Sequence, residues 1–323
     1  MFSFVENRFR FYGIATALVV FSLLSPWIFG TNKGIDMTGG IQIEYAVSGD
    51  RDAALAKARE LAEALKSEIK VGNTAVVNGT TVYGIAGTDS FIVEAGFSLG
   101  EKISESELQG AKAAFTKSLT EKLSAEKDMK ITESRYVNIG ESFGAYIKKS
   151  AYITLSMAII MIAIYIAYAF RGSIPGMASW PFAVVTGVSL IHDVIVAFGL
   201  YVATSYFFPE FKIDTFFLTA LLTILGYSIN DTIVVMDRIR SNLRDSGGKK
   251  MGLSHVIDGA IHDTMRRSLL TSSTVFIVLL AMFFFGPESL KGFTLALLFG
   301  TVVGTYSSIC IASPLLVDIT KKK

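Results

Sequence analysis

Six long stretches of mostly apolar residues divide the sequence. Each is long enough to cross the hydrocarbon layer of a membrane, about 30 Å thick, as a helix of about 20 residues. They cover residues 11–29, 146–170, 180–207, 216–235, 269–285 and 293–317. The first follows Arg8 and Arg10, as in a signal peptide, but it ends around Trp27 without a small-residue cleavage motif. We therefore predict six transmembrane helices, the first of them uncleaved.

Residues 31–145 show a different pattern, in which charged residues are frequent and no apolar stretch is long enough to span a membrane. Ile41, Ile43 and Tyr45 alternate with polar residues, as in a half-buried strand. Asp50 and Ser104 stand where N-caps of two amphipathic helices are expected. The pattern predicts strands at 41–45, 74–83, 90–95 and 129–137 and helices at 50–68 and 104–123. This β-α-β-β-α-β order is that of a ferredoxin-like domain.

The predicted fold class is therefore a polytopic α-helical membrane protein with an inserted ferredoxin-like βαββαβ domain. Hydrophobic residues make up 51% of the 323 residues, more than in an ordinary soluble domain. The predicted parts are 1–30, the N-terminus and first helix; 31–145, the inserted domain; and 146–323, helices 2 to 6 with a polar loop at 237–267.

Basic residues in the short polar segments predict the orientation of the helices, because such residues concentrate on the cytoplasmic side. One side carries Arg8, Arg10, Arg171, the basic residues between 238 and 267 and the lysines at 321–323; the other carries Lys212 and Lys291. We therefore predict that both termini and the 237–267 loop are cytoplasmic and that 31–145 lies on the opposite side.

Several classes of function find no support in the sequence. Cys310 is the single cysteine, so no intramolecular disulfide and no cysteine metal site are expected. The three histidines have no metal-ligand spacing, and no phosphate-binding or dinucleotide-binding glycine motif is present. Residues 31–149 contain 15 basic and 17 acidic residues, a balance that does not indicate nucleic-acid binding. The absence of motifs does not exclude an enzyme, but nothing in the sequence argues for one, and we expect no metal or cofactor.

The fourth apolar stretch contains a polar stripe. Thr219, Thr223, Tyr227 and Asp231 recur every four residues and would share one helix face. A carboxylate at bilayer depth costs about 2.5–3.5 kcal/mol on insertion scales, so an intramembrane Asp indicates function by default. The alternative is that the stripe serves only as polar contact between helices.

Other polar residues lie in neighbouring stretches. Asp193 shares a face with Thr186 and Ser189, and His192 beside it is expected to make a structural polar contact. Arg267 opens the fifth stretch; it is either a partner for Asp231 or a cytoplasmic flanking residue. Small residues recur every four positions in the last stretch, which is typical of close helix packing. They are Ala296, Gly300, Gly304, Ser308 and Ala312.

Five short segments together resemble motifs of the SecD/SecF family of bacterial protein-export membrane proteins, in the RND superfamily. The longest is Gly226-Tyr-Ser-Ile-Asn-Asp-Thr-Ile-Val-Val-Met-Asp-Arg-Ile-Arg240. Another, Gly34-Ile-Asp-Met-Thr-Gly-Gly40, follows the first helix and has Met37 where the family commonly has Phe. The others are at 191–194, at 267–272, with Ser268 in place of Thr, and at 306–316. The resemblance covers nearly the whole chain, and it is closest to the SecF branch.

The resemblance implies half of an RND-type fold with a periplasmic domain between helices 1 and 2, in the bacterial cytoplasmic (inner) membrane. A SecD subunit would supply the other half. The implied function is to promote protein export with the proton-motive force, acting on unfolded polypeptides at the SecYEG channel after the SecA motor. YajC is a further implied partner, and membrane lipid surrounds the helices. The implied role is that of a non-enzymatic, proton-coupled transport subunit, for which the proton gradient rather than a cofactor supplies energy.

The resemblance also implies site residues. Asp231 and Arg267 match the family's intramembrane charged pair, and Asp193 belongs to the same expected proton pathway. Asn230, Thr232, Tyr227 and His192 are expected to be supporting polar residues. The motif after the first helix contributes Gly34, Asp36, Gly39 and Gly40.

Two alternatives stay open. The chain could be a passive scaffold that holds SecD and the channel together, in which case Asp231 and Arg267 are structural. It could also be half of a small-molecule exporter of the RND type, although the small inserted domain and the export motifs argue against this.

Overall fold

The computed structural model of the chain describes residues 2–85, 87–97, 104–125, 129–171, 178–245 and 252–320. Contacts within the chain divide it into two compact units. The helical unit comprises Met1–Thr31, Tyr152–Phe207 and Phe216–Lys323. The α/β unit comprises Asn32–Ala151, close to the predicted 31–145, and also Phe208–Thr215, which the sequence pattern placed in a loop between two membrane helices.

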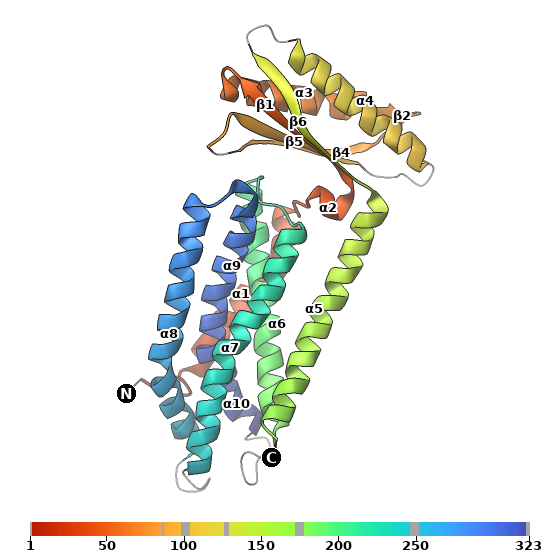
Figure 1. The fold of residues 1–323 in the computed structure, drawn as a ribbon. Coiled ribbons are helices and arrows are strands. Elements are labelled where there is room, and N and C mark those ends of the chain that lie inside the picture. The colour runs from red at the N-terminus through yellow and green to blue at the C-terminus, as the bar shows by residue number, and fades with distance from the viewer. Residues whose placement is uncertain are drawn as a thin grey trace. The chain divides into compact units, whose positions relative to one another are not determined.

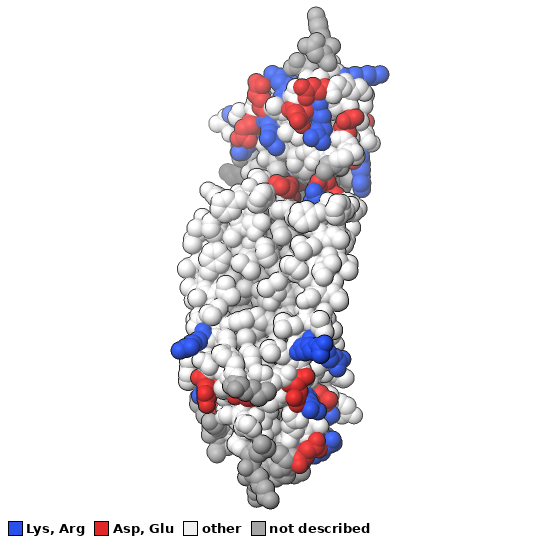
Figure 2. Space-filling view, turned by 90° about the vertical axis from the view of Figure 1, so that its left-hand side faces the viewer, with Lys and Arg blue, Asp and Glu red and all other residues white. Residues whose placement is uncertain are grey.

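Six helical segments are long and apolar enough to cross a membrane, which confirms the six predicted spans. They are α1 (Arg8–Phe29), α5 (Glu141–Ala169), α6 (Trp180–Phe207), α7 (Thr215–Asp245), α8 (Leu253–Phe285), and the continuous run of α9 (Glu288–Ser307), η1 (Ser308–Ala312) and α10 (Ser313–Thr320) (Figure 1). On the face of the helical unit seen in Figure 2, a long part of the surface carries neither basic nor acidic side chains. Such a surface suits contact with lipid.

Two of these helices continue beyond the apolar stretches. Most of 237–267, predicted as a loop, is helical, because α7 ends at Asp245 and α8 begins at Leu253. The extensions keep apolar residues at helical spacing, and Ile239, Ile257 and Ile261 are buried together in one core cluster. Burial of this apolar face stabilises the helical extensions, so the helices continue beyond the apolar stretches.

The last helical segment contains a π-helical turn, η1. Pro314 follows this turn and has no backbone N–H to donate to the carbonyl of Cys310, so the regular α-helical pattern cannot continue there. The Ser313 hydroxyl donates instead to the Ser308 carbonyl at 2.8 Å. The chain ends are then held together within the helical unit, because Arg8 forms an ion pair with Asp318 of α10 at 3.0 Å.

The α/β unit contains a four-stranded antiparallel sheet with strand order β4-β5-β1-β6. Its strands are β1 (Gly40–Ser48), β4 (Val77–Gly84), β5 (Ser90–Phe97) and β6 (Lys130–Ile139). Helices α3 (Arg51–Glu68) and α4 (Glu105–Ser124) bury their apolar sides in the same core as Ile41, Ile43 and Phe91 (Figure 1). A short helix, α2 (Ile35–Thr38), precedes the sheet.

Both predicted helix caps are present in this unit. The Asp50 side chain accepts from the backbone N–H groups of Asp52 and Ala53. Ser104 and Glu107 form a complete capping box at the start of α4. The predicted strand at 74–83 is divided, because β3 (Thr74–Ala75) turns back at Gly72 to pair with β2 (Lys70–Val71) before β4 begins.

Candidate functional site

Helix α6 places Asp193 in the interior of the helical unit, where its side chain is 0% exposed. The Ser307 hydroxyl of α9 donates to Asp193 Oδ2 at 2.8 Å, and the Ser228 hydroxyl of α7 donates to the same oxygen. His192 Nδ1 lies 3.0 Å from Asp193 Oδ1. This carboxyl group therefore joins three helices through charge-assisted hydrogen bonds, which are the strong kind in a low-dielectric interior.

A further hydroxyl extends this group. Ser189, one turn before Asp193 on α6, donates to Ser307 Oγ at 3.0 Å. The predicted shared face of Ser189 and Asp193 is thus observed, and both residues are fully buried. His192 Nε2 is buried without a hydrogen-bond partner among the residues that the structure describes. A buried ring nitrogen without a hydrogen bond is unfavourable, and His192 Nε2 can form one more hydrogen bond.

Asp231 has a different environment. Asp231 is 5% exposed, and its Oδ2 atom is buried with no hydrogen-bond partner in the described part of the chain. The Ser268 hydroxyl of α8 lies close to this carboxyl group, and the Arg267 charge on the same helix attracts it. The Ser268 hydroxyl is likewise buried and without a hydrogen-bond partner there. The structure thus brings Asp231 and Arg267 into one neighbourhood, but as an attraction rather than a hydrogen-bonded ion pair.

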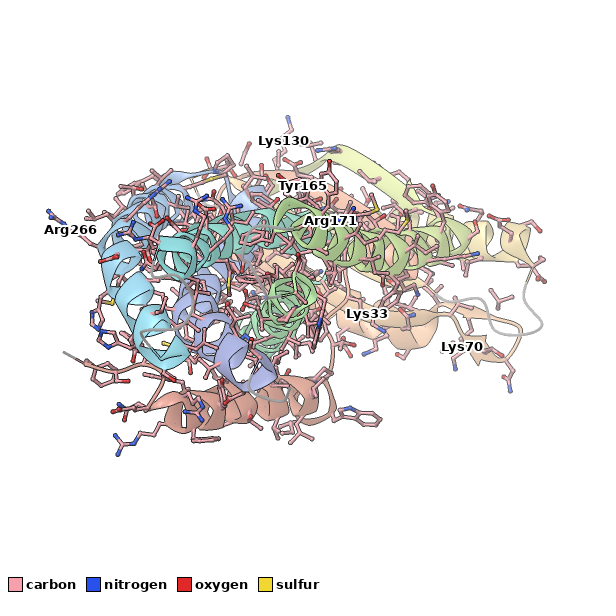
Figure 3. The ribbon with its side chains drawn as sticks, turned by 90° about the horizontal axis from the view of Figure 1, so that it is seen from below. Lys33, Lys70, Lys130, Tyr165, Arg171 and Arg266 are labelled. Atoms are coloured by element: carbon pink, nitrogen blue, oxygen red, sulfur yellow. The ribbon has the colours of Figure 1, made fainter. Side chains whose placement is uncertain are left out.

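Two basic residues near the middle of α8 are exposed. They are Arg267 and Arg266, and the Arg266 side chain points away from the helices (Figure 3). The guanidinium group of Arg267 is therefore accessible from outside the chain while it attracts Asp231. Contact with solvent or a partner protein would change that attraction without disturbing the core.

The predicted supporting residues on α7 differ in burial. Tyr227 is half-buried and lies beside Ser272 and Thr305, whose hydroxyl oxygens are 2.6 Å apart. Thr232 is buried, and its hydroxyl donates to the Ser228 carbonyl at 3.1 Å. Asn230 is exposed. Helix α7 therefore contributes to two clusters of polar side chains. One surrounds Asp193, and the other contains Asp231 and Tyr227.

The polar stripe predicted on this helix is buried only near Asp231. Thr219 and Thr223, earlier on the same stripe, are exposed in this single chain. Thr223 satisfies its hydroxyl by donating to the Thr219 carbonyl at 2.8 Å. The stripe is therefore not one continuous buried face. It is exposed at Thr219 and Thr223 and becomes buried toward Asp231.

The residues of the motif after the first helix lie together in the α/β unit. Gly39 has a φ of +77°, and a Cβ at Gly40 would lie 2.4 Å from the Ala95 carbonyl oxygen of β5. Glycine is therefore required for the close approach of this segment to the sheet. Asp36 accepts a hydrogen bond from the Thr215 hydroxyl at 2.9 Å. Gly34 packs against Asp214, which belongs to the same unit.

Sequence reasoning missed the two hydroxyls that hold Asp193. Ser228 lies beside the four-residue stripe of α7 and not on it, and Ser307 lies beside the small-residue stripe of α9. The four-residue spacing between Ser228 and Thr232 was no signal in the sequence, because only the structure shows that Thr232 is buried. The stripe itself packs closely: a Cβ at Gly300 would lie 2.2 Å from Ile224, and one at Gly304 3.1 Å from Ser228.

No group of three or more metal-binding side chains occurs among the described residues. The chemistry available at the site is therefore that of two buried carboxyl groups, hydroxyls, an imidazole and a guanidinium. These groups can bind and release protons and exchange hydrogen bonds. One carboxyl group has its hydrogen bonds satisfied and the other has an oxygen without a partner.

Known proteins resemble this chain over nearly its whole length. Residues 119–322 match the family model of the protein export membrane protein SecD/SecF, C-terminal. The chain is 34% identical over 315 residues to the protein translocase subunit SecF of Sebaldella termitidis, covering 97% of this chain and 90% of that protein. It is 33% identical over 329 residues to the SecF subunit of Thermobaculum terrenum, covering 100% of this chain and 95% of that one.

A solved structure shares the fold. The crystal structure of SecDF, a translocon-associated membrane protein from Thermus thermophilus, matches with a TM-score of 0.74 at 24% identity. The match covers 99% of this chain but only 39% of that longer chain. From the family model and the full-length similarity to SecF subunits, this chain belongs to the SecD/SecF family of protein export membrane proteins.

Proposed function

We propose that this chain is a proton-coupled accessory subunit of protein export. It works with a SecD subunit in the bacterial inner membrane and promotes movement of unfolded polypeptides through SecYEG after SecA has acted. The observation that carries the proposal is the pair of buried carboxyl groups, Asp193 and Asp231, on adjacent membrane helices with opposite hydrogen-bonding status.

The different environments give the two groups different roles. Asp193 accepts hydrogen bonds from two hydroxyls and is the fixed member. Asp231 has an oxygen without a partner, so a proton arriving there changes its charge and turns an acceptor into a donor. Protonation would cancel its attraction to Arg267. Because α7 also bonds Asp193 through Ser228, a shift of α7 would be felt by α6 and α9.

The energy available is adequate for such a shift. One charge that crosses a potential of about 100 mV yields about 2.3 kcal/mol. Since about 1.4 kcal/mol is a factor of ten in an equilibrium, one proton would change the ratio of two helix arrangements by about 40-fold. A two-state packing of α7 could therefore be driven without any bound cofactor.

Exposed polar residues support the need for a second subunit. On α7, Thr219, Thr223 and Asn230 are exposed, and on α8, Arg267 and Thr271 are exposed. Polar groups within spans normally face a protein interior, because lipid cannot satisfy them. Helices of a SecD subunit would cover this surface and enclose Asp231.

The orientation and the soluble part are also proposals. The positive-inside rule supports cytoplasmic termini and a periplasmic α/β unit. The order of β1, α3, β4, β5, α4 and β6, with sheet order β4-β5-β1-β6, supports a ferredoxin-like fold for that unit.

The test is Asp231→Asn in vesicles that contain the chain, its SecD partner, SecYEG and SecA. We expect normal insertion but loss of the export stimulation that a proton gradient provides. Asp237→Asn is the matched control, because Asp237 is exposed on the same helix and the chemical change is the same. Full stimulation by Asp231→Asn would show that the carboxyl group is structural and would favour the scaffold function.

A further inference from the structure

The segment between α6 and α7 belongs to the α/β unit. Phe208–Thr215 follows directly from α6 and leads into α7, yet its contacts group it with Asn32–Ala151. The chain therefore passes between the two units at both ends of this segment, in addition to the two passages that any inserted domain has. The α/β unit is covalently continuous with the two helices that carry Asp193 and Asp231.

Backbone hydrogen bonds fix this segment to the start of the unit. Gly34 N donates to the Ile213 carbonyl at 2.9 Å, and Ile213 N donates to the Asn32 carbonyl at 2.8 Å. The Asn32 side chain donates to the carbonyls of Pro209 and Phe211 at 2.7 and 3.1 Å. Phe211 and Ile213 are both buried. The segment is thus held as an extra piece of the domain and not as a free loop.

A buried ion pair fastens the same segment to the sheet. Lys212 Nζ bonds Glu94 Oε2 of β5, and the two side chains are only 7% and 10% exposed. The other oxygen, Glu94 Oε1, accepts from Tyr83 at 2.8 Å and from Gln42 at 3.2 Å. Lys212 Nζ also lies 5.4 Å from the centre of the Tyr83 ring. Burial, and then the Glu94 charge, raise the pKa of Tyr83, so this phenol keeps its proton and remains a donor.

The end of the segment is fixed where α7 begins. Asp36 Oδ2 accepts from the hydroxyl of Thr215 at 2.9 Å and from its backbone N–H at 3.4 Å. Thr215 is the first residue of α7, and a carboxylate at a helix N-terminus is favourable. At Gly34 an added Cβ would lie 3.0 Å from the Cβ of Asp214, so the two strands of chain are in close contact there.

We propose that Phe208–Thr215, seated on Asn32–Asp36 and closed by the Lys212–Glu94 ion pair, is a permanent coupling joint that makes the α/β unit follow the ends of α6 and α7. The inference rests on the proposed function and adds Lys212 and Glu94 as positioning residues. Opening the joint would separate the ions of a buried pair, which is strongly unfavourable. The joint keeps the segment seated in the α/β unit, so movement of the ends of α6 and α7 reaches that unit through it.

Lys212→Met tests the joint because it removes the charge but keeps an apolar stem. The loss of a buried pair should shift the closed population by about 100-fold or more. In reconstituted vesicles with the partner subunit and the channel, we expect proton uptake to continue while gradient-driven export stimulation is lost. Lys122→Met is the matched control, because Lys122 pairs with Glu68 in the same unit with both side chains exposed, 41% and 53%. Retained stimulation in Lys212→Met would overturn the joint.

A reversible disulfide gives the decisive comparison. Gly34→Cys with Asp214→Cys, in a Cys310→Ser background, places two Cβ atoms 3.0 Å apart. Disulfides have a Cβ–Cβ spacing of about 3.5–4.5 Å, so the bond needs the two segments to separate by about half an ångström. Added to Lys212→Met, the oxidised pair should restore coupling and the reduced pair should not. Failure of oxidation to restore coupling, or loss of coupling on oxidation when Lys212 is present, would overturn the proposal.

One measurement separates this inference from the proposed function. Thiol labelling of Asp214→Cys alone reports opening of the joint and needs no proton gradient. Labelling should be slow in that variant and faster when Lys212→Met is added; equal rates would overturn the joint. Absence of proton uptake and stimulation in the unchanged protein would instead count against the proposed function.

Discussion

The three helices around Asp193 should depend on its hydrogen bonds more than on its charge. Replacement by alanine removes the acceptor for Ser228, Ser307 and His192. Ser307 keeps an alternative, because its hydroxyl also lies 3.1 Å from the Gly304 carbonyl. Ser228 and His192 therefore lose their partners, and each buried group left unsatisfied costs about 1–3 kcal/mol. The expected loss for Asp193→Ala is about 2–6 kcal/mol in the free energy of unfolding.

Asp193→Asn should cost much less. The amide keeps one acceptor oxygen, and its NH₂ group can donate to a serine hydroxyl that turns to accept. Only the charge assistance of the hydrogen bonds is lost, which amounts to about 1 kcal/mol. The unchanged protein should therefore be the most stable, Asp193→Asn slightly less stable, and Asp193→Ala much less stable than both.

Equilibrium unfolding of the purified protein in mixed micelles, followed by circular dichroism during a denaturing-detergent titration, measures these differences. Ser205→Ala is the control, because Ser205 is buried on the same helix but donates only to the Val202 carbonyl at 2.8 Å. Combining Asp193→Ala with Ser228→Ala should be less costly than the sum of the two, because the orphaned hydroxyl is gone. Equal stability of the Asn and Ala variants would refute the reasoning.

Two further predictions concern packing and capping. Gly300→Ala should destabilise the helical unit by about 1–3 kcal/mol, because the new Cβ would clash with Ile224. Ile224→Ala in the same chain should recover most of the lost stability. No recovery would mean that another contact is limiting. Ser104→Ala should cost about 1 kcal/mol at the start of α4 and speed hydrogen exchange in its first turn. The backbone hydrogen bond from Ser104 lowers the pKa of Glu107, so its stabilising effect is present above the ordinary carboxyl pKa and is lost as pH falls through the lowered value. Glu107→Gln should therefore weaken the acid dependence of that exchange, and an unchanged dependence would contradict the capping role.

Local chemistry allowed much of the fold to be predicted. The number of membrane spans follows from the length of each apolar stretch, because lipid tolerates few polar groups over that distance. The helix starts at Asp50 and Ser104 follow from side chains that cap their own backbone within three residues. Asp231 was identified in the same way, since a carboxyl group in an apolar run is visible without any knowledge of its neighbours.

The partners of each charged residue depended on the tertiary structure. Ser228 and Ser307 come to Asp193 from helices far along the chain, and nothing in their local pattern distinguishes them from other serines. The sequence assigned Lys212 to one side of the membrane by its charge alone, and only the structure shows that it is buried against Glu94. Sequence periodicity shows which face of an element is apolar, but it contains no information on which distant element that face will meet. Hydrogen bonds and ion pairs act over about 3 Å, so only the packed chain decides which groups are close enough to form them.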